Sequence, residues 1–284
     1  MRPARIRQPG PPPAERLVAV AARGRAFPVT LEAGAPLLET ARRGLAAQGF
    51  AGGVLELRDV ALAPFAYVMP ALSQTPDHAA FYSQTFRPAH VTRLRAGAMT
   101  LGRRDGAAFF HTHALWREHD GALRGGHILP EETCVAETTT VEAFGLDGAI
   151  FAAVRDPETN FKLFEPVAIE PIAGLDAPRR AFALRLRPNE DFAGALEAFC
   201  LAQGVTRARI RGGVGSTIGA AFVDGRVVDN FATEVYVADG VVDADGARLD
   251  VGLVDYTGAV AEGRLERGDN PVLMTFELVL EALD

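Results

Sequence analysis

The two halves of the chain repeat one pattern of helix, glycine and strands, and this internal repeat is the feature that most limits the fold. Residues 35–49 and 189–204 each predict a helix with a buried apolar stripe that ends in Gln-Gly. The glycine of the second helix, Gly204, lies 155 residues after the glycine of the first, Gly49. Strand-like segments follow both helices, so we expect both halves to form units of the same kind.

A second pair of matching positions shows that the two copies differ in length. Gly126-His127 matches Gly263-Arg264, and these positions are 137 residues apart rather than 155. The first copy therefore carries 18 more residues between its helix and this match. We place the extra length in the loose segment 61–88, which is predicted to be a long loop with one short helix, and expect it to form a pocket wall.

Length and composition agree with two domains. A chain of 284 residues, of which 48% are hydrophobic, is long enough for two domains of about 100–150 residues, each with its own core. Four prolines interrupt the periodic pattern between residues 155 and 180, so the boundary is expected near the end of that segment. We predict a first domain at 14–168 and a second at 179–284.

Three of the six histidines fall in one short hairpin. Residues 109–116 are predicted to be a strand, so His111 and His113 point to the same face. A two-residue turn at Asp120-Gly121 would send His127 to the opposite face, whereas a three-residue loop with its glycine left-handed would pair His113 with His127. We predict the three-residue loop, because only this register brings the three imidazoles together.

This arrangement has the chemistry of a metal site. Cross-strand neighbours have Cβ atoms about 4.5–5.5 Å apart, so His111, His113 and His127 can reach one ion at about 2.0–2.1 Å. Three neutral histidines with an open fourth position are typical of catalytic zinc. The alternative is that they are ordinary hydrogen-bonded residues of a half-buried face. Glu131 and Glu132 are the carboxylates nearest in sequence and are candidate ligand-binding residues, unless they form a solvated turn.

The second copy lacks these histidines. Its matching positions are Arg248, Asp250 and Arg264, and the register predicts an ion pair between Asp250 and Arg264. The second copy is therefore predicted to be structural, with a degenerate site.

Charge and apolar pattern limit the partners. A net charge of −7 opposes general nucleic-acid binding, which depends on clustered Lys and Arg. No apolar run approaches the roughly 18 residues of a membrane span, and residues 1–13 lack the apolar core of a signal peptide. Cys134 and Cys200 are isolated and are expected to be small core residues of a reduced protein. We therefore predict a cytoplasmic location without membrane contact.

Together these features resemble the PPC domain, the plant and prokaryote conserved domain, in two tandem copies. The resemblance rests on the two helix-then-glycine segments, on Arg-Ile-Arg-Gly-Gly-Val-Gly at 209–215, and on His-x-His followed by Gly-Gly-His at 111–127. It implies an α/β (α+β) fold, in which a mixed, mostly antiparallel sheet packs with helices, and a homotrimer. It also implies metal binding through three histidines, here His111, His113 and His127.

Three functions follow as hypotheses. The first is a protein that binds zinc or a similar divalent metal and an unknown small molecule, in a binding or enzymatic role. The second is a DNA-associated regulator, which the family suggests although the Arg-Gly-Arg-Pro core of an AT-hook is missing. The third is an oligomerisation module whose histidines pack at a subunit interface. Metal content distinguishes the first from the other two.

Overall fold

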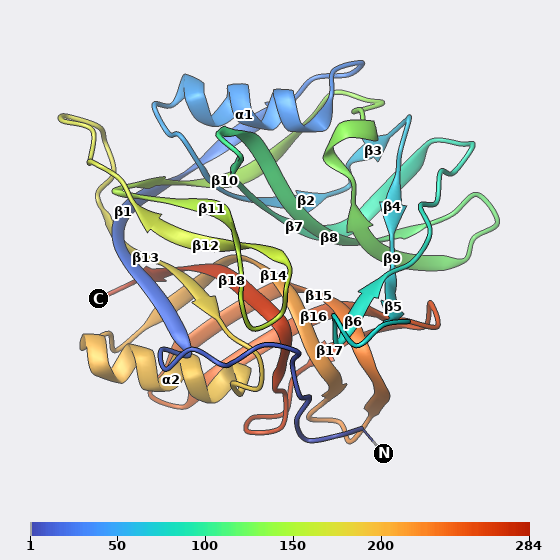
Figure 1. Cartoon of the computed structure of the whole chain (residues 1–284). Helices are drawn as coiled ribbons and strands as arrows, with labels where there is room; N and C mark the ends of the chain where they lie inside the picture. Colours follow the sequence, from blue (N-terminus) through green and yellow to red (C-terminus); the bar gives the residue numbers. More distant parts are fainter. Residues whose placement is uncertain (1) are drawn as a thin grey trace.

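The computed structural model describes residues 2–284 and consists mostly of β-strands (Figure 1). Strands make up 55% of it and helices 9%, and the described residues contain only two α-helices. The predicted α/β (α+β) class, with a sheet packed with helices, is therefore wrong. Two helices of 11 and 12 residues cannot cover a sheet of 16 strands, and much of the sheet is covered by other strands instead.

One sheet contains 16 strands, and its pairs are antiparallel except for that between β7 and β11. The order along its main path is β17-β16-β15-β14-β18-β13-β1-β10-β2-β7-β8-β9-β4, with β3, β11 and β12 at its side, while β5 and β6 form a separate hairpin. The strands are β1 Leu17–Leu31, β2 Gly53–Arg58, β3 Ala61–Leu62, β4 Tyr67–Val68, β5 Pro70–Leu72, β6 Ala80–Tyr82, β7 Thr92–Arg104, β8 Ala107–Arg117, β9 Leu123–Ile128, β10 Thr139–Asp147, β11 Ala149–Arg155, β12 Lys162–Ala168, β13 Arg179–Leu186, β14 Ala208–Ala221, β15 Val227–Asp243, β16 Gly246–Asp255, β17 Val260–Arg264 and β18 Val272–Ala282.

The strand order is the same on both sides of the pair formed by β1 and β13. Outward from this pair, the sheet runs β1-β10-β2-β7-β8-β9 in one direction and β13-β18-β14-β15-β16-β17 in the other. A helix follows the first strand of each series in the sequence: α1, Leu37–Ala47, follows β1, and α2, Phe192–Gln203, follows β13.

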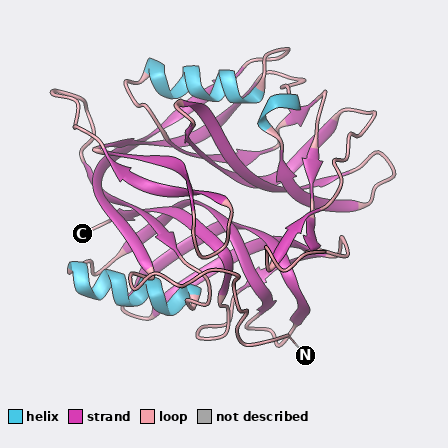
Figure 2. Ribbon diagram, viewed as in Figure 1, coloured by secondary structure: helices cyan, strands magenta, loops and turns pink. Residues whose placement is uncertain are grey.

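The sheet folds back on itself, so that strands of the two series face each other. β14 packs against β2 and β7, β15 against β7 and β8, and β16 against β8 and β9. The helices lie on opposite outer sides of the molecule with the strands between them (Figures 1 and 2). Apolar side chains from both series share buried clusters, such as Leu115 with Tyr236 and Val54 with Val279. The two halves therefore share part of their core.

Both helices end close to the predicted positions. Gly49 and Gly204 follow α1 and α2 with φ of 86° and 64°, left-handed values that suit glycine. Asp191 caps α2, because its Oδ1 accepts the N–H of Gly194 at 2.8 Å. Within residues 2–284 no helix is long and apolar enough to cross a membrane.

The longer connection of the first half, 61–88, forms short strands rather than a loop with a helix. It contains β3 and β4, which join the main sheet, and the separate hairpin of β5 and β6. Its backbone groups are hydrogen-bonded within the segment and to more distant residues: the Ser83 N–H donates to the Met69 carbonyl at 2.9 Å, and the Ala63 N–H donates to the Cys134 carbonyl at 3.0 Å. Tyr82 of this hairpin lies next to His127, which belongs to the site described below.

Candidate metal centre and its pocket

The histidine hairpin has the predicted register. β8 and β9 pair His113 with His127, and across the three-residue loop the Glu118 N–H donates to the Ala122 carbonyl at 2.9 Å. Gly121 in this loop has a φ of 81°, which glycine adopts without a steric penalty. The prediction of a three-residue loop is therefore confirmed, and His127 lies on the face that carries His113.

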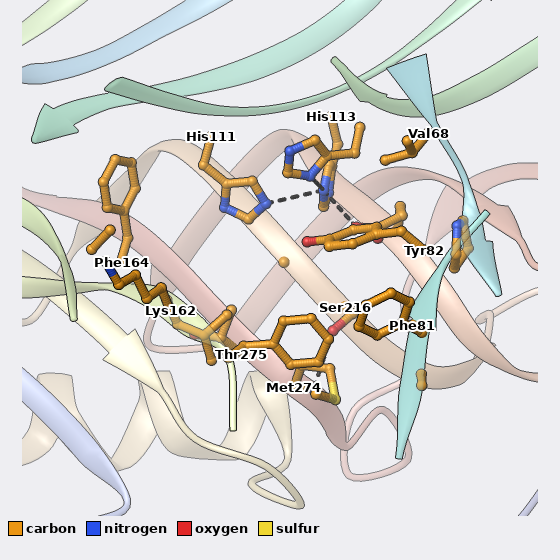
Figure 3. A pocket seen from close by; sticks show the side chains of 18 of the residues that line it. Val68, Phe81, Tyr82, His111, His113, Lys162, Phe164, Ser216, Met274 and Thr275 are labelled. Carbon is orange, nitrogen blue, oxygen red and sulfur yellow. Dashed lines mark hydrogen bonds and ion pairs between the residues drawn. The ribbon is translucent and has the colours of Figure 1, made fainter. Parts of the chain in front are cut away.

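The three imidazoles converge, and Figure 3 shows those of His111 and His113 side by side at the edge of the pocket. Nε2 of His111 lies 3.1 Å from Nε2 of His113, which in turn lies 3.3 Å from Nδ1 of His127. A tetrahedral ion bound at about 2.0–2.1 Å holds its ligand nitrogens about 3.3–3.4 Å apart. The observed separations are thus close to those that one bound ion requires.

Hydrogen bonds fix the orientation of two of the rings. Nδ1 of His113 donates to the Val235 carbonyl at 3.0 Å, and Nδ1 of His111 donates to the carboxylate of Glu277. Because a carbonyl and a carboxylate only accept, both rings carry a proton on Nδ1. When the rings are neutral, their unprotonated Nε2 atoms therefore face each other. A cation between them, or one shared proton, relieves this contact.

A carboxylate completes the group. Oε2 of Glu234, on β15, lies 2.5 Å from Nε2 of His113. One donor atom from each of the three histidines and Glu234 lies within 4.8 Å of all the others, so these four residues could hold a metal ion. Sequence reasoning missed Glu234, since nothing in its local pattern distinguishes it from other strand carboxylates and it lies more than a hundred residues from the hairpin.

The surroundings set the charge of the imidazoles. Burial lowers the pKa of His111, but the charge and hydrogen bond of Glu277 and the charge of Glu234 outweigh it and leave this pKa above its usual value. Burial, together with the positive charges of neighbouring side chains, holds the pKa of His127 well below its usual value. His127 is therefore neutral near pH 7 and has a lone pair available for a metal.

A cavity of about 560 Å³ opens beside the histidines. Ser216, Met274 and Thr275, from β14 and β18, lie across the cavity from the histidines, and Phe81 and Tyr82 of the β5–β6 hairpin form another side (Figure 3). The Tyr82 ring lies 5.3 Å from the His127 ring, centroid to centroid. The longer connection of the first half thus forms a pocket wall, as predicted.

Of the two carboxylates predicted to bind a ligand, Glu131 lies at the pocket and Glu132 lies outside it. Glu131 is exposed and lines the cavity. Glu132 does not line it and instead forms a two-pronged salt bridge with Arg87, whose Nε lies 2.7 Å from its Oε2. The Arg87 hydrogen bond lowers the pKa of the Glu132 carboxyl. The structure therefore brings Glu131, but not Glu132, to the histidine pocket.

The matching positions of the second half form a different arrangement. Asp250 pairs with Arg264 in the sheet, as the register predicts, and their side chains form a salt bridge of 2.8 Å. Arg248 instead pairs with Asp243. The second half nevertheless contributes Glu234 and Glu277, which contact the histidines of the first half.

Known proteins resemble parts of this chain. A plant- and prokaryote-conserved (PPC) protein from Pyrococcus horikoshii is 14% identical, with a TM-score of 0.41, over 53% of this chain and 97% of that protein. A metal-containing protein from Archaeoglobus fulgidus is 18% identical, with a TM-score of 0.39, over 50% of this chain and 94% of that protein. A candidate DNA-binding protein from Ralstonia eutropha is 11% identical, with a TM-score of 0.34, over 50% of this chain and 90% of that protein. No family model and no curated protein matches the chain.

Proposed function

We propose that this protein binds zinc or a similar divalent metal at His111, His113 and His127 and a small molecule in the adjoining pocket. The convergence of the His111 and His113 Nε2 atoms carries this proposal, because Glu277 and Val235 hold the protons of both rings on the opposite nitrogens. A divalent cation satisfies the facing lone pairs.

Charge supports the same assignment. Glu277 is fully buried, and one of its carboxylate oxygens, Oε2, has no hydrogen-bond partner among the described residues. Glu234 adds a second, nearly buried carboxylate beside the same histidines. A protonated His111 supplies only one positive charge for these two buried carboxylates, whereas a divalent cation balances both. We assign Glu234 as a fourth donor to the ion and Glu277 as the residue that orients His111.

The pocket gives this centre a role beyond structure. When bound, a zinc-type ion acts as a Lewis acid toward a carbonyl or similar oxygen. Tyr82 of the β5–β6 hairpin packs against His127, and Glu131 is proposed to contact the bound molecule at the edge of the cavity. These residues suit a metal-dependent binding protein or enzyme that acts on a small molecule.

We also propose that the halves are two tandem PPC-like domains, at 14–168 and 179–284. The equal strand orders on the two sides of the β1–β13 pair support this, as do the end of β12 at Ala168 and the start of β13 at Arg179. The homotrimer and the cytoplasmic location remain predictions from resemblance and composition, and light scattering tests the first of them.

Metal analysis tests the proposed function. Protein purified without a histidine tag and incubated with zinc is expected to retain about one ion per chain after gel filtration. The variant His113→Ala is expected to lose the ion, because it removes the central ligand. His90→Ala is the matched control, since His90 is exposed, packs against the His119 ring and lies outside the pocket. Metal-free wild-type protein, or full metal content in His113→Ala, would overturn the proposal.

A further inference from the structure

Five phenylalanine and tyrosine side chains line the pocket beside the metal centre. Phe109 lies on the same strand as His111 and His113, Phe164 comes from β12, and Phe81 and Tyr82 come from the β5–β6 hairpin. Phe161, in the loop between β11 and β12, packs against both hairpin residues, with ring centroids 5.7 and 5.9 Å apart. Rings in such a lining favour a flat aromatic guest, which they contact by stacking and edge-to-face packing.

Hydrogen bonds hold the loop and the hairpin that form these walls in place. Asp156, at the start of the loop that carries Phe161, is fully buried and accepts hydrogen bonds from Arg185 and Arg187, both at 2.6 Å. The hairpin is tied to the same loop, because Nδ2 of Asn160 donates to the Asp77 carbonyl at 2.9 Å. A cavity fixed in this way loses little conformational entropy when a ligand binds.

The rim of the pocket carries two cations and the exposed carboxylate of Glu131. The Arg104 guanidinium lies over the Phe109 ring, 5.0 Å from its centroid, and forms no ion pair within residues 2–284. Lys162, the chain's single lysine, also lines the pocket, and its Nζ lies 2.7 Å from Asp105. Of these two cations, Arg104 has its hydrogen-bond donors free for a ligand. A guanidinium held on a ring presents a planar fork that matches a carboxylate.

We infer that the pocket binds aromatic carboxylates, with the ring between the aromatic walls and the carboxylate on Arg104. The inference deepens the proposed function and rests on it only in placing the rest of the ligand toward the metal centre. It follows from three features together: a cavity of small-molecule size lined by aromatic rings, a stacked arginine without a carboxylate partner, and internal carboxylates already in contact with the histidines.

Arg103 provides a matched control for Arg104. The two arginines are consecutive on β7, so their side chains point to opposite faces, and both are exposed. Only Arg104 lines the pocket. Replacing either one removes the same charge from the same strand, so a difference between the variants reports on the pocket and not on net charge.

Titration calorimetry with benzoate tests the inference, with benzyl alcohol as the neutral analogue and hexanoate as the non-aromatic acid. We expect benzoate to bind most tightly and Arg104→Ala to weaken it about tenfold, the size of one lost charge-assisted pair. Arg103→Ala is expected to leave the Kd unchanged. Equal binding of benzyl alcohol or hexanoate, or an unchanged Kd in Arg104→Ala, would overturn the inference.

Repeating the titration on zinc-loaded and chelator-treated protein separates this inference from the proposed function. Benzoate binding that depends on Arg104 in both forms supports the carboxylate site whether or not the protein retains zinc. If benzoate binding is lost when zinc is removed, and Arg104→Ala does not change it, the carboxylate binds the ion itself. That result would refute the carboxylate site at the rim and leave the metal site standing.

Discussion

At the scale of residues, the candidate site depends as much on the groups that hold the imidazoles as on the imidazoles themselves. Glu277 fixes the protonated nitrogen of His111, and the Val235 carbonyl does the same for His113. Neither partner is a proposed ligand of the ion, yet each decides which ring nitrogen is free to bind it. Such partners commonly change metal affinity by about 10–100-fold when they are removed.

Glu277→Gln is therefore predicted to lower zinc affinity by about 10–100-fold while the three ligands stay in place. A competition titration with a coloured chelator measures this affinity. The control is Glu281→Gln, which changes another buried glutamate of β18 that pairs with Arg211 instead of a histidine. Affinity that falls equally in both variants would indicate a general loss of packing and would argue against an orienting role for Glu277.

The same glutamate makes the metal-free protein sensitive to pH. Glu277 raises the pKa of His111 against the effect of burial, so the folded state binds this proton more tightly than the unfolded state does. The resulting stabilisation is fully present below the unfolded pKa of about 6.5 and is lost as pH rises through the higher folded pKa. The melting temperature of chelator-treated protein is expected to fall over this range, and less so in Glu277→Gln. Equal slopes for the two proteins would contradict the assignment.

At the scale of elements, local chemistry made the histidine hairpin and both helix ends predictable. Gly121 adopts the left-handed conformation that a three-residue loop requires. The loop length in turn sets the face on which His127 lies. Gly49 and Gly204 end the helices for the same steric reason. The segment 61–88 was predicted to be a long loop because its strands have only two or three residues each, too few for an apolar alternation to show.

Deletion of Asp120 tests the importance of the register. With Asp120 removed, a loop that stays three residues long, with Gly121 last, draws in Glu118 and pairs Arg117 with Ala122; this places His127 opposite Thr112 and turns its ring away from His113. We expect this variant to fold but to lose the bound zinc. Gly121→Ala keeps the loop length and adds only backbone strain of about 1–2 kcal/mol, because the space around Gly121 is open. It is therefore expected to melt at a lower temperature and retain the ion, and zinc retained after the deletion would refute the argument.

At the scale of the whole molecule, the fold class and half of the site could not be predicted, for one common reason. Periodicity along the sequence shows which face of a strand is buried but not what buries it. Here the strands of the second half cover those of the first, so helices cover little of the sheet. The same folding back carries Glu234 and Glu277 to the histidines from more than a hundred residues away. Matching His113 with Asp250 showed that the second half has no histidine site of its own, but not that it completes the first.

The last prediction compares two carboxylates of the second half, Glu234 and Asp250, and asks whether this half takes part in binding the ion. Glu234 lies on β15 and Asp250 on the neighbouring strand β16. Glu234 contacts His113, whereas Asp250 pairs with Arg264 at an exposed position. A bound ion stabilises the folded state by mass action, so a chelator lowers the melting temperature of the wild-type protein. Glu234→Gln is expected to reduce zinc affinity and shrink this chelator-sensitive shift. Asp250→Ala is expected to keep both, because this exposed pair is weakened by solvent and does not involve the ion. If the shift is unchanged in Glu234→Gln, the first half binds the ion alone, and the second half only shields it.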